Sequence, residues 1–175
     1  MGKCVRKLAC LVLISACQSR PAGELPVSSA AADSLVLDRS RCFGSCPAYR
    51  LSLRADGRVT FTAMAPGGLN PVRTDSIAPS QFAWLLQQGQ RIGLASFPSV
   101  IAEDKSLCRV RATDHATATV TIFWPDSTRQ VIDYLGCYGG ADLTVAAPLA
   151  QLRRFETQID SLAQSERWTR SATRH

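Results

Sequence analysis

The chain has 175 residues, 46% of them hydrophobic, and its formal net charge is +6. This length fits one domain with a sizeable core. Three of the positive charges are Lys3, Arg6 and Lys7; without them the rest of the chain carries only +3 and contains no basic run, so nucleic acid is not an expected partner.

The first residues have the pattern of a secretory signal peptide. Residues 8–14 are apolar and follow the basic start, but a membrane-spanning helix needs about 20 such residues. The run Ile14-Ser15-Ala16-Cys17 resembles the lipobox of bacterial lipoproteins, in which the cysteine thiol accepts a diacylglycerol before cleavage. The alternative is an ordinary signal peptide cleaved nearby, which would leave Cys17 as an odd thiol.

These features predict a lipoprotein signal peptide over residues 1–16, a flexible tether over residues 17–32 and a single domain over residues 33–170. A lipid on Cys17 would anchor the domain to a membrane of the bacterial cell envelope, facing the periplasm. By the sorting rule of enterobacterial-type lipoproteins, Gln18 in place of aspartate favours the outer membrane.

Seven cysteines occur, of which two lie in the predicted signal peptide and one is the predicted lipidation site. Four remain, namely Cys42, Cys46, Cys108 and Cys137. An even number in an oxidising compartment predicts two disulfides, and four cysteines allow three connectivities. We favour Cys42–Cys46 and Cys108–Cys137; the second would close a loop of about 30 residues and stabilise the fold by about 3–4 kcal/mol.

Strands are predicted in the first half of the domain at residues 34–37, 49–54, 59–63 and 72–77, and alternating apolar residues mark the second and the third of them. A three-residue loop ending at Gly57, with this glycine in the left-handed conformation, sets Leu53 opposite Val59 and keeps the apolar faces matched. A helix follows, capped by Ser80 and ended by Gly93. Its apolar face consists of Phe82, Leu85, Leu86 and Ile92.

The second half begins with an expected loop over residues 95–106, in which Phe97 enters the core. Strands are predicted at residues 107–111, 120–124 and 129–135, with a turn at 125–127 and a glycine-containing loop at 136–143. Pro148 starts a C-terminal helix. Its apolar stripe is Leu149, Leu152, Phe155, Ile159 and Leu162. The order of elements predicts an α+β fold, with a mainly antiparallel sheet and two helices packed on one face.

The segment from Arg41 to Tyr49 reads R-C-F-G-S-C-P-A-Y. It resembles the bacterial lipoprotein family called domain of unknown function 6438, whose hallmark is a C-F-G-x-C-P-x-Y stretch that runs into a strand and an Asp-Gly turn. Further agreement lies at Thr113-Asp114, Asp133-Tyr134, Ile159-Asp160 and Trp168. The resemblance implies a single domain and implies no activity, substrate or catalytic residue.

The chemistry-bearing residues are few. Cys42 and Cys46 are interpreted as a structural disulfide, because their C-x3-C spacing is not the C-x-x-C of thioredoxin-like enzymes; a redox pair is the alternative. Four cysteines without two C-x2-C knuckles do not predict zinc. Only two histidines occur, so any Ser-His-Asp or Cys-His arrangement would have to use His115. No metal and no cofactor is predicted.

A candidate ligand groove joins five residues, Arg41, Phe43, Asp114, His115 and Tyr134. Our first hypothesis is a non-catalytic, lipid-anchored envelope protein that binds another envelope component, with the membrane and an envelope protein as partners. The second is an envelope enzyme: a thiol oxidoreductase through Cys42 and Cys46, or a weak acid-base hydrolase through Asp114 and His115. The sequence carries no indication of an oligomeric state, and we lean against an enzyme.

Overall fold

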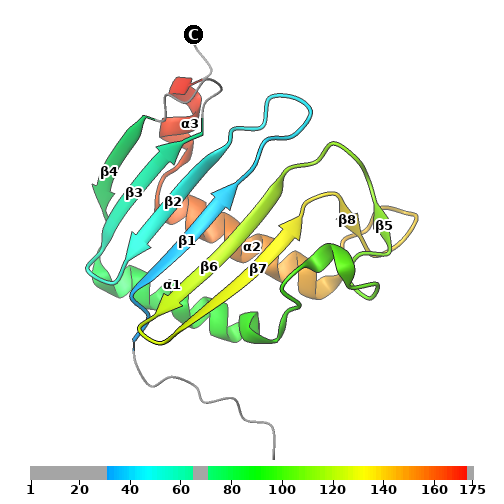
Figure 1. Ribbon diagram of the computed structural model, residues 1–175, viewed down its shortest axis with the longest axis horizontal. Helices are drawn as coiled ribbons and strands as arrows, with labels where there is room; N and C mark the ends of the chain where they lie inside the picture. The colour runs from blue at the N-terminus through cyan, green and yellow to red at the C-terminus, as the bar shows by residue number, and fades with distance from the viewer. Residues whose placement is uncertain (1–30, 65–70, 173–175) are drawn as a thin grey trace, which may run out of the picture.

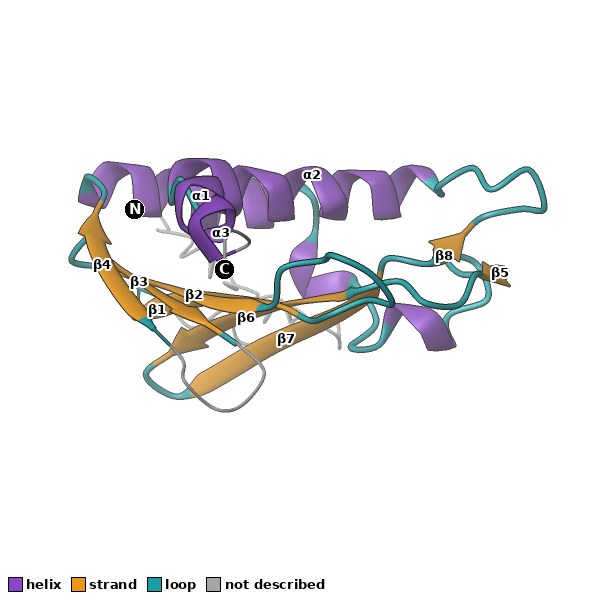
Figure 2. Cartoon of the chain, turned by 90° about the horizontal axis from the view of Figure 1, so that it is seen from above, coloured by secondary structure: helices purple, strands orange, loops and turns teal. Residues whose placement is uncertain are grey.

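The computed structural model describes residues 31–64 and 71–172. It is an α+β domain with a six-stranded antiparallel sheet in the order β4-β3-β2-β1-β6-β7 and with its long helices on one face, as predicted (Figures 1 and 2). The sheet contains β1 (Ser34–Arg39), β2 (Tyr49–Arg54), β3 (Arg58–Ala63), β4 (Val72–Ser76), β6 (Thr117–Trp124) and β7 (Ser127–Tyr134). The helices are α1 (Pro79–Arg91), α2 (Ala147–Leu162) and the short α3 (Glu166–Ala172), which was not predicted.

The β2–β3 hairpin has the predicted register, with Leu53 opposite Val59. Gly57 lies in the left-handed region at φ +87°, and a Cβ there would lie 2.2 Å from the carbonyl oxygen of Ile77. Asp56 accepts a hydrogen bond from the amide of Arg58 at 3.0 Å, which closes the turn. Turn chemistry and the apolar face therefore select the same register.

The core lies between the sheet and the helices. One cross-strand row that faces the helices is apolar and buried on the five strands from β3 to β7 in the sheet; it runs through Phe61, Leu51, Leu37, Val120 and Val131. Four residues of the predicted stripe on α2 are buried against the sheet, while Leu162 is half-buried. After α2 the chain turns at Gln164, and Trp168 of α3 packs against Phe61 with ring centroids 5.1 Å apart.

Two predictions about helix α1 and the long loops are corrected by the structure. Helix α1 is capped by Ala78 and not by Ser80, because Pro79 occupies the first helical position and the Gln81 side chain accepts the amide of Ala78 at 2.8 Å. Gly93 ends the helix in the left-handed conformation, as predicted. The expected loop at 95–106 contains two single 3-10 turns, η1 (Leu94–Ser96) and η2 (Ile101–Glu103).

The expected glycine-containing loop at 136–143 begins with a short strand. This strand, β8 (Cys137–Tyr138), pairs with β5 (Val110–Arg111) and forms a second, two-stranded sheet. The predicted strand at 107–111 is thereby reduced to its last two residues. Both strands are too short for periodicity to reveal, and the disulfide between Cys108 and Cys137 lies beside their pairing.

The predicted signal peptide, Cys17 and nearly all of the predicted tether lie outside the described residues. Within the described part of the chain, no helix is long and apolar enough to cross a membrane.

Candidate functional site

The loop between β1 and β2, residues 40–48, is the most exposed part of the predicted site; we call it the disulfide loop. Cys42 and Cys46 are bonded to each other, with Cα atoms 5.5 Å apart, in the predicted pairing. Between them Phe43 is 90% exposed, the highest value among the exposed large apolar side chains of the described residues. Gly44 lies in the left-handed region at φ +149°. The loop therefore displays an aromatic side chain on a backbone closed by a covalent bond.

Hydrogen bonds fix the base of the disulfide loop on both sides. The Ser40 amide donates to the carbonyl oxygen of Thr117 at 2.9 Å, and the Thr117 amide donates to Ser40 Oγ at 2.8 Å. On the other side, Arg41 donates to the carbonyl oxygen of Met64 at 2.8 Å, and the Met64 amide donates to that of Ala48 at the same distance. The loop is thus tied to the adjoining ends of β3 and β6.

The segment before β6, residues 112–116, lies beside the disulfide loop; we call it the histidine loop. The backbone carbonyl oxygen of Asp114 accepts a hydrogen bond from the Phe43 amide at 3.2 Å. Asp114 itself adopts φ 68°, a left-handed conformation that aspartate tolerates. The Tyr134 hydroxyl donates to the carbonyl oxygen of Ala112 at 2.7 Å and accepts the amide of His115 at 3.3 Å. Tyr134 thereby holds the histidine loop in place.

The residues of the predicted groove therefore come from neighbouring segments. Phe43 and Asp114 are joined through the backbone, and His115 packs edge-on against Tyr134 with ring centroids 6.4 Å apart. Arg41 is directed to Met64, on the β3 side of the disulfide loop. An open depression lined by Arg58, Thr74, Asp75 and Ser76 lies at the far end of β3, away from all five.

The Asp114 and His115 side chains do not form an acid-base pair in the described structure. The Asp114 carboxylate accepts a hydrogen bond from the Thr113 hydroxyl at 3.0 Å, whereas the His115 ring contacts the rings of Tyr134 and Tyr138 edge-on. Gly136 makes this packing feasible, because a Cβ there would lie 2.4 Å from the carbonyl oxygen of Ala112. The two side chains therefore have separate partners.

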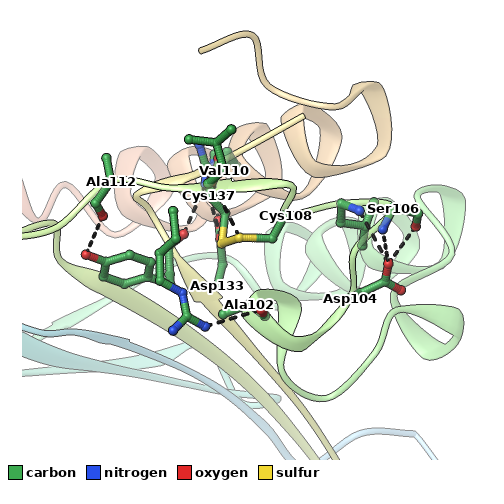
Figure 3. Close-up of a disulfide and its surroundings, with 12 residues drawn as sticks. Ala102, Asp104, Ser106, Cys108, Val110, Ala112, Asp133 and Cys137 are labelled. Carbon is green, nitrogen blue, oxygen red and sulfur yellow. Dashed lines mark hydrogen bonds and ion pairs between the residues drawn. A yellow bond between two sulfur atoms is a disulfide. The ribbon is translucent and has the colours of Figure 1, made fainter. Parts of the chain in front are cut away.

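The second disulfide, Cys108–Cys137, also has the predicted pairing and lies inside the domain (Figure 3). Its cysteines are 4% and 0% exposed. Asp104 caps the preceding turn by accepting the Ser106 amide at 2.7 Å. From α2, the Arg153 guanidinium donates to the carbonyl oxygen of Cys137 at 3.2 Å. This disulfide therefore joins β8 to the residues that precede β5, and Arg153 connects β8 to α2.

A second group of interacting polar side chains was not predicted: a buried charge cluster between the sheet and α2. It consists of Arg39, Tyr49, Asp133, Arg153, Glu156, Asp160 and Ser165. The sheet supplies part of it in a single cross-strand row, in which Tyr49, Arg39, Ala118 and Asp133 are successive partners. The small Ala118 leaves room above the sheet for the side chains of α2.

Arg39 is the central cation of the cluster. It donates to Asp160 Oδ2 at 2.8 Å and to Glu156 Oε2 at 3.2 Å. The other oxygen of Asp160 accepts the Tyr49 hydroxyl at 2.6 Å and the Ser165 hydroxyl at 2.9 Å. Burial, followed by the nearby Asp160 carboxylate, raises the pKa of Tyr49 to about 12. Burial by itself would lower the pKa of Arg39, but the two carboxylates raise it above its usual value.

Glu156 is the unusual member of the cluster. It is 1% exposed, and its Oε1 has no hydrogen-bond partner within the described part of the chain. Burial, then the charge of Asp133, raises the pKa of Glu156 to about 8, although Arg39 and Arg153 act in the opposite direction. Asp133 is 0% exposed and is paired with Arg153 through two hydrogen bonds of 2.8 and 3.2 Å.

The sequence did contain a signal for the cluster. Leu35 and Leu37 face the core, so alternation along β1 places Arg39 on the same face; Val131 does the same for Asp133. The cluster is therefore marked by polar residues at positions where the spacing along a strand or helix predicts a side chain that faces the core. Across residues 31–64 and 71–172, no group of three or more His, Cys, Asp or Glu side chains is arranged to hold a metal ion.

Comparison with known proteins identifies the family to which most of the chain is matched. The chain matches the family described as Domain of unknown function (DUF6438) over residues 33–163. The match runs from the start of β1 to the end of α2 and so includes the disulfide loop, the histidine loop and all of the buried charge cluster except Ser165. No curated protein matches the chain.

Proposed function

The chain belongs to the DUF6438 family, and on this premise we propose that it is a lipid-anchored protein of the bacterial cell envelope that acts by binding another envelope component. The binding surface is the end of the sheet formed by the disulfide loop and the histidine loop. The partner is an envelope protein, and the anchoring membrane is the outer membrane, facing the periplasm.

The anchoring part of the proposal is supported by the run from Ile14 to Cys17 and by Gln18. Two disulfides agree with an oxidising compartment. The position of β1 also agrees, because the first described residues lie at the end of the sheet opposite the disulfide loop (Figure 1). A domain tethered there would keep its proposed binding surface directed away from the anchor.

The binding part of the proposal depends on one observation, the exposure of Phe43. Burying a phenylalanine side chain is worth about 1.5–3 kcal/mol, and this one is 90% exposed. The disulfide and the hydrogen bond to Asp114 already restrict the loop, so little conformational entropy remains to be lost on association. An exposed aromatic residue on a closed loop is suited to fill an apolar pocket of a protein partner.

The anchor is tested in bacterial cells that are supplied with an alkyne fatty acid. The wild-type protein is expected to incorporate the label and to fractionate with outer membranes, and Cys17→Ser is expected to lose both. Labelling that persists in Cys17→Ser would contradict the anchor while leaving the binding proposal untouched.

Binding is tested by formaldehyde crosslinking of cells that produce the protein at low level. Phe43→Ser is expected to abolish the crosslinked species seen for the wild type. The matched control is Phe123→Ser, the same substitution at an exposed phenylalanine at the other end of the sheet. Equal loss in both variants, or in neither, would contradict a role for the disulfide loop.

A thiol oxidoreductase is the second candidate, because Cys42 and Cys46 are only half-buried and a soluble thiol can reach them. Turnover of a disulfide substrate by the purified protein, abolished by Cys42→Ser, would favour this candidate over binding. The arrangement of Asp114 and His115 gives no corresponding support to a hydrolase.

A further inference from the structure

The two disulfides lie in contrasting environments. Cys108 and Cys137 are almost completely buried, so a reductant reaches them only when the domain opens. Cys42 and Cys46 are half-buried, and the residues between them, Phe43 among them, are exposed. The Cys42–Cys46 bond therefore lies in a more exposed part of the fold than the Cys108–Cys137 bond.

Gly44 contributes to this access. A Cβ at this position would lie 3.8 Å from Cys42 Sγ, in van der Waals contact, and no other described atom outside its chain neighbours would lie within 4 Å of it. Glycine thus places no side chain beside Cys42 Sγ on this side of the loop. Any larger residue would place its side chain beside the sulfur.

The disulfide loop is built so that this bond can break without loss of the fold. Its base is held by the hydrogen bonds between Ser40 and Thr117, and β1 and β2 pair directly up to Arg39 and Tyr49. Within the described structure, two constraints close the turn: the hydrogen bond that the Phe43 amide donates to Asp114 and the disulfide itself. Reduction therefore loosens the part that carries Phe43 and leaves the sheet paired.

We propose that Cys42–Cys46 is a thiol–disulfide exchange site that takes a protein dithiol as its co-reactant, and that its redox state controls the rigidity of the Phe43 segment. A thiolate of the dithiol attacks Cys42 Sγ, the bond between the sulfurs breaks, and Cys46 leaves as a thiolate that takes up a proton. The second thiol of the co-reactant then attacks the mixed disulfide and releases Cys42. Two electrons pass from the dithiol to the protein, and the co-reactant becomes a disulfide.

The consequence for binding rests on the proposed function, whereas the exchange itself does not. A closed loop presents Phe43 ready for a partner, and an open loop must be ordered on association, which weakens binding. The exchange site thereby becomes a control on the binding surface.

The exchange is tested on the full-length protein purified in detergent and titrated with dithiothreitol, a small dithiol. Free thiols are alkylated and assigned to each cysteine by peptide mass spectrometry. We expect Cys42 and Cys46 to react at about a tenfold lower reductant concentration than Cys108 and Cys137, with an unchanged circular dichroism spectrum. Simultaneous reaction of all four cysteines, or reaction only on unfolding, overturns the proposal.

Access to the sulfur is tested with Gly44→Ala, which is expected to slow the reduction of Cys42–Cys46. Gly93→Ala is the matched control, since it also lies in the left-handed region, at φ +70°, but with open space around it. An equal reduction rate in Gly44→Ala and the wild type would overturn attack at Cys42.

Control of the loop is read from chymotrypsin cleavage after Phe43. Cleavage is expected to rise about tenfold on selective reduction, because a protease needs a locally mobile segment. The Cys42→Ser/Cys46→Ser double variant should be cleaved at the reduced rate under all conditions. Selective reduction with unchanged cleavage overturns control of the loop. The reduction and cleavage measurements do not depend on the proposed binding function. They keep their meaning even if the crosslinking experiment fails to support binding through Phe43.

Discussion

Glu156→Gln is predicted to abolish a pH dependence of stability that the buried charge cluster produces. The substitution keeps the size and shape of the side chain and removes its ability to ionise. With Glu156 protonated, the cluster contains two arginines, Arg39 and Arg153, and two aspartates, Asp133 and Asp160. Ionisation of Glu156 would add a third negative charge at a site that is 1% exposed.

The magnitude follows from the raised pKa. Glu156 has a pKa of about 8 in the folded protein, against 4.5 as its ordinary value. Below pH 4.5 Glu156 is protonated in both the folded and the unfolded protein. The stability that comes from keeping this side chain neutral in the fold is then fully present. As the pH rises from there to about 8 the unfolded chain ionises first, and the free energy of unfolding falls by about 1.4 kcal/mol per pH unit. The total loss is on the order of 5 kcal/mol, and above pH 8 it is constant.

The assay is urea unfolding followed by tryptophan fluorescence at pH 5, 7 and 9. The difference in unfolding free energy between Glu156→Gln and the wild type isolates the glutamate, since the other groups titrate in both proteins. The variant is expected to be within about 1 kcal/mol of the wild type at pH 5, because the amide replaces a neutral carboxyl group. It is expected to be more stable than the wild type at pH 9.

The control is Glu103→Gln, the same change at an exposed glutamate on η2. A stability difference for Glu156→Gln that is the same at pH 5 and pH 9 would refute the reasoning. It would mean that the cluster accommodates a third anion and that burial does not govern this carboxyl group.

Three further substitutions test the geometry of the fold. Gly57→Ala should cost about 2 kcal/mol or more in a melting experiment, because of its positive φ and the nearby carbonyl group of Ile77; a neutral result would show that the turn relaxes. Arg153→Met should cost about 3–5 kcal/mol in urea unfolding, since it leaves the buried carboxylate of Asp133 unpaired, and recovery in the Arg153→Met/Asp133→Leu double variant checks this cause. Tyr49→Phe should cost about 1.5–3 kcal/mol through the lost hydrogen bond to a carboxylate, with an unchanged far-ultraviolet spectrum; a larger loss accompanied by a changed spectrum would indicate a packing role instead.

The parts of the fold that could be predicted are those in which local signals agree. The β2–β3 hairpin combines strict alternation with an Asp-Gly turn, so its register followed from the sequence. The same holds for the apolar stripe of α2. The even count of cysteines predicted two disulfides, and the structure has the favoured pairing among the three connectivities that the sequence left open.

The parts that could not be predicted depend on contacts between distant segments. The pairing of β1 with β6 joins strands from the two halves of the chain, and no local pattern encodes it. A charged residue such as Arg39 is ordinarily assigned to the surface, and its burial becomes stable only once the carboxylates of α2 are placed beside it. Helix α3 is only seven residues long, and it is held by the packing of Trp168 against β3.

The central position of β1 has a consequence for the order in which the domain can assemble. β1 to β4 form a meander of neighbours in sequence, so their contacts are local and can form early. The second edge of β1 finds its partner only when β6 has been synthesised, and its apolar face is covered last, by α2 near the end of the chain. A chain truncated before Thr117 would therefore expose a strand edge beside an uncovered apolar face, a combination that promotes aggregation. Folding of this domain is consequently linked to completion of the chain.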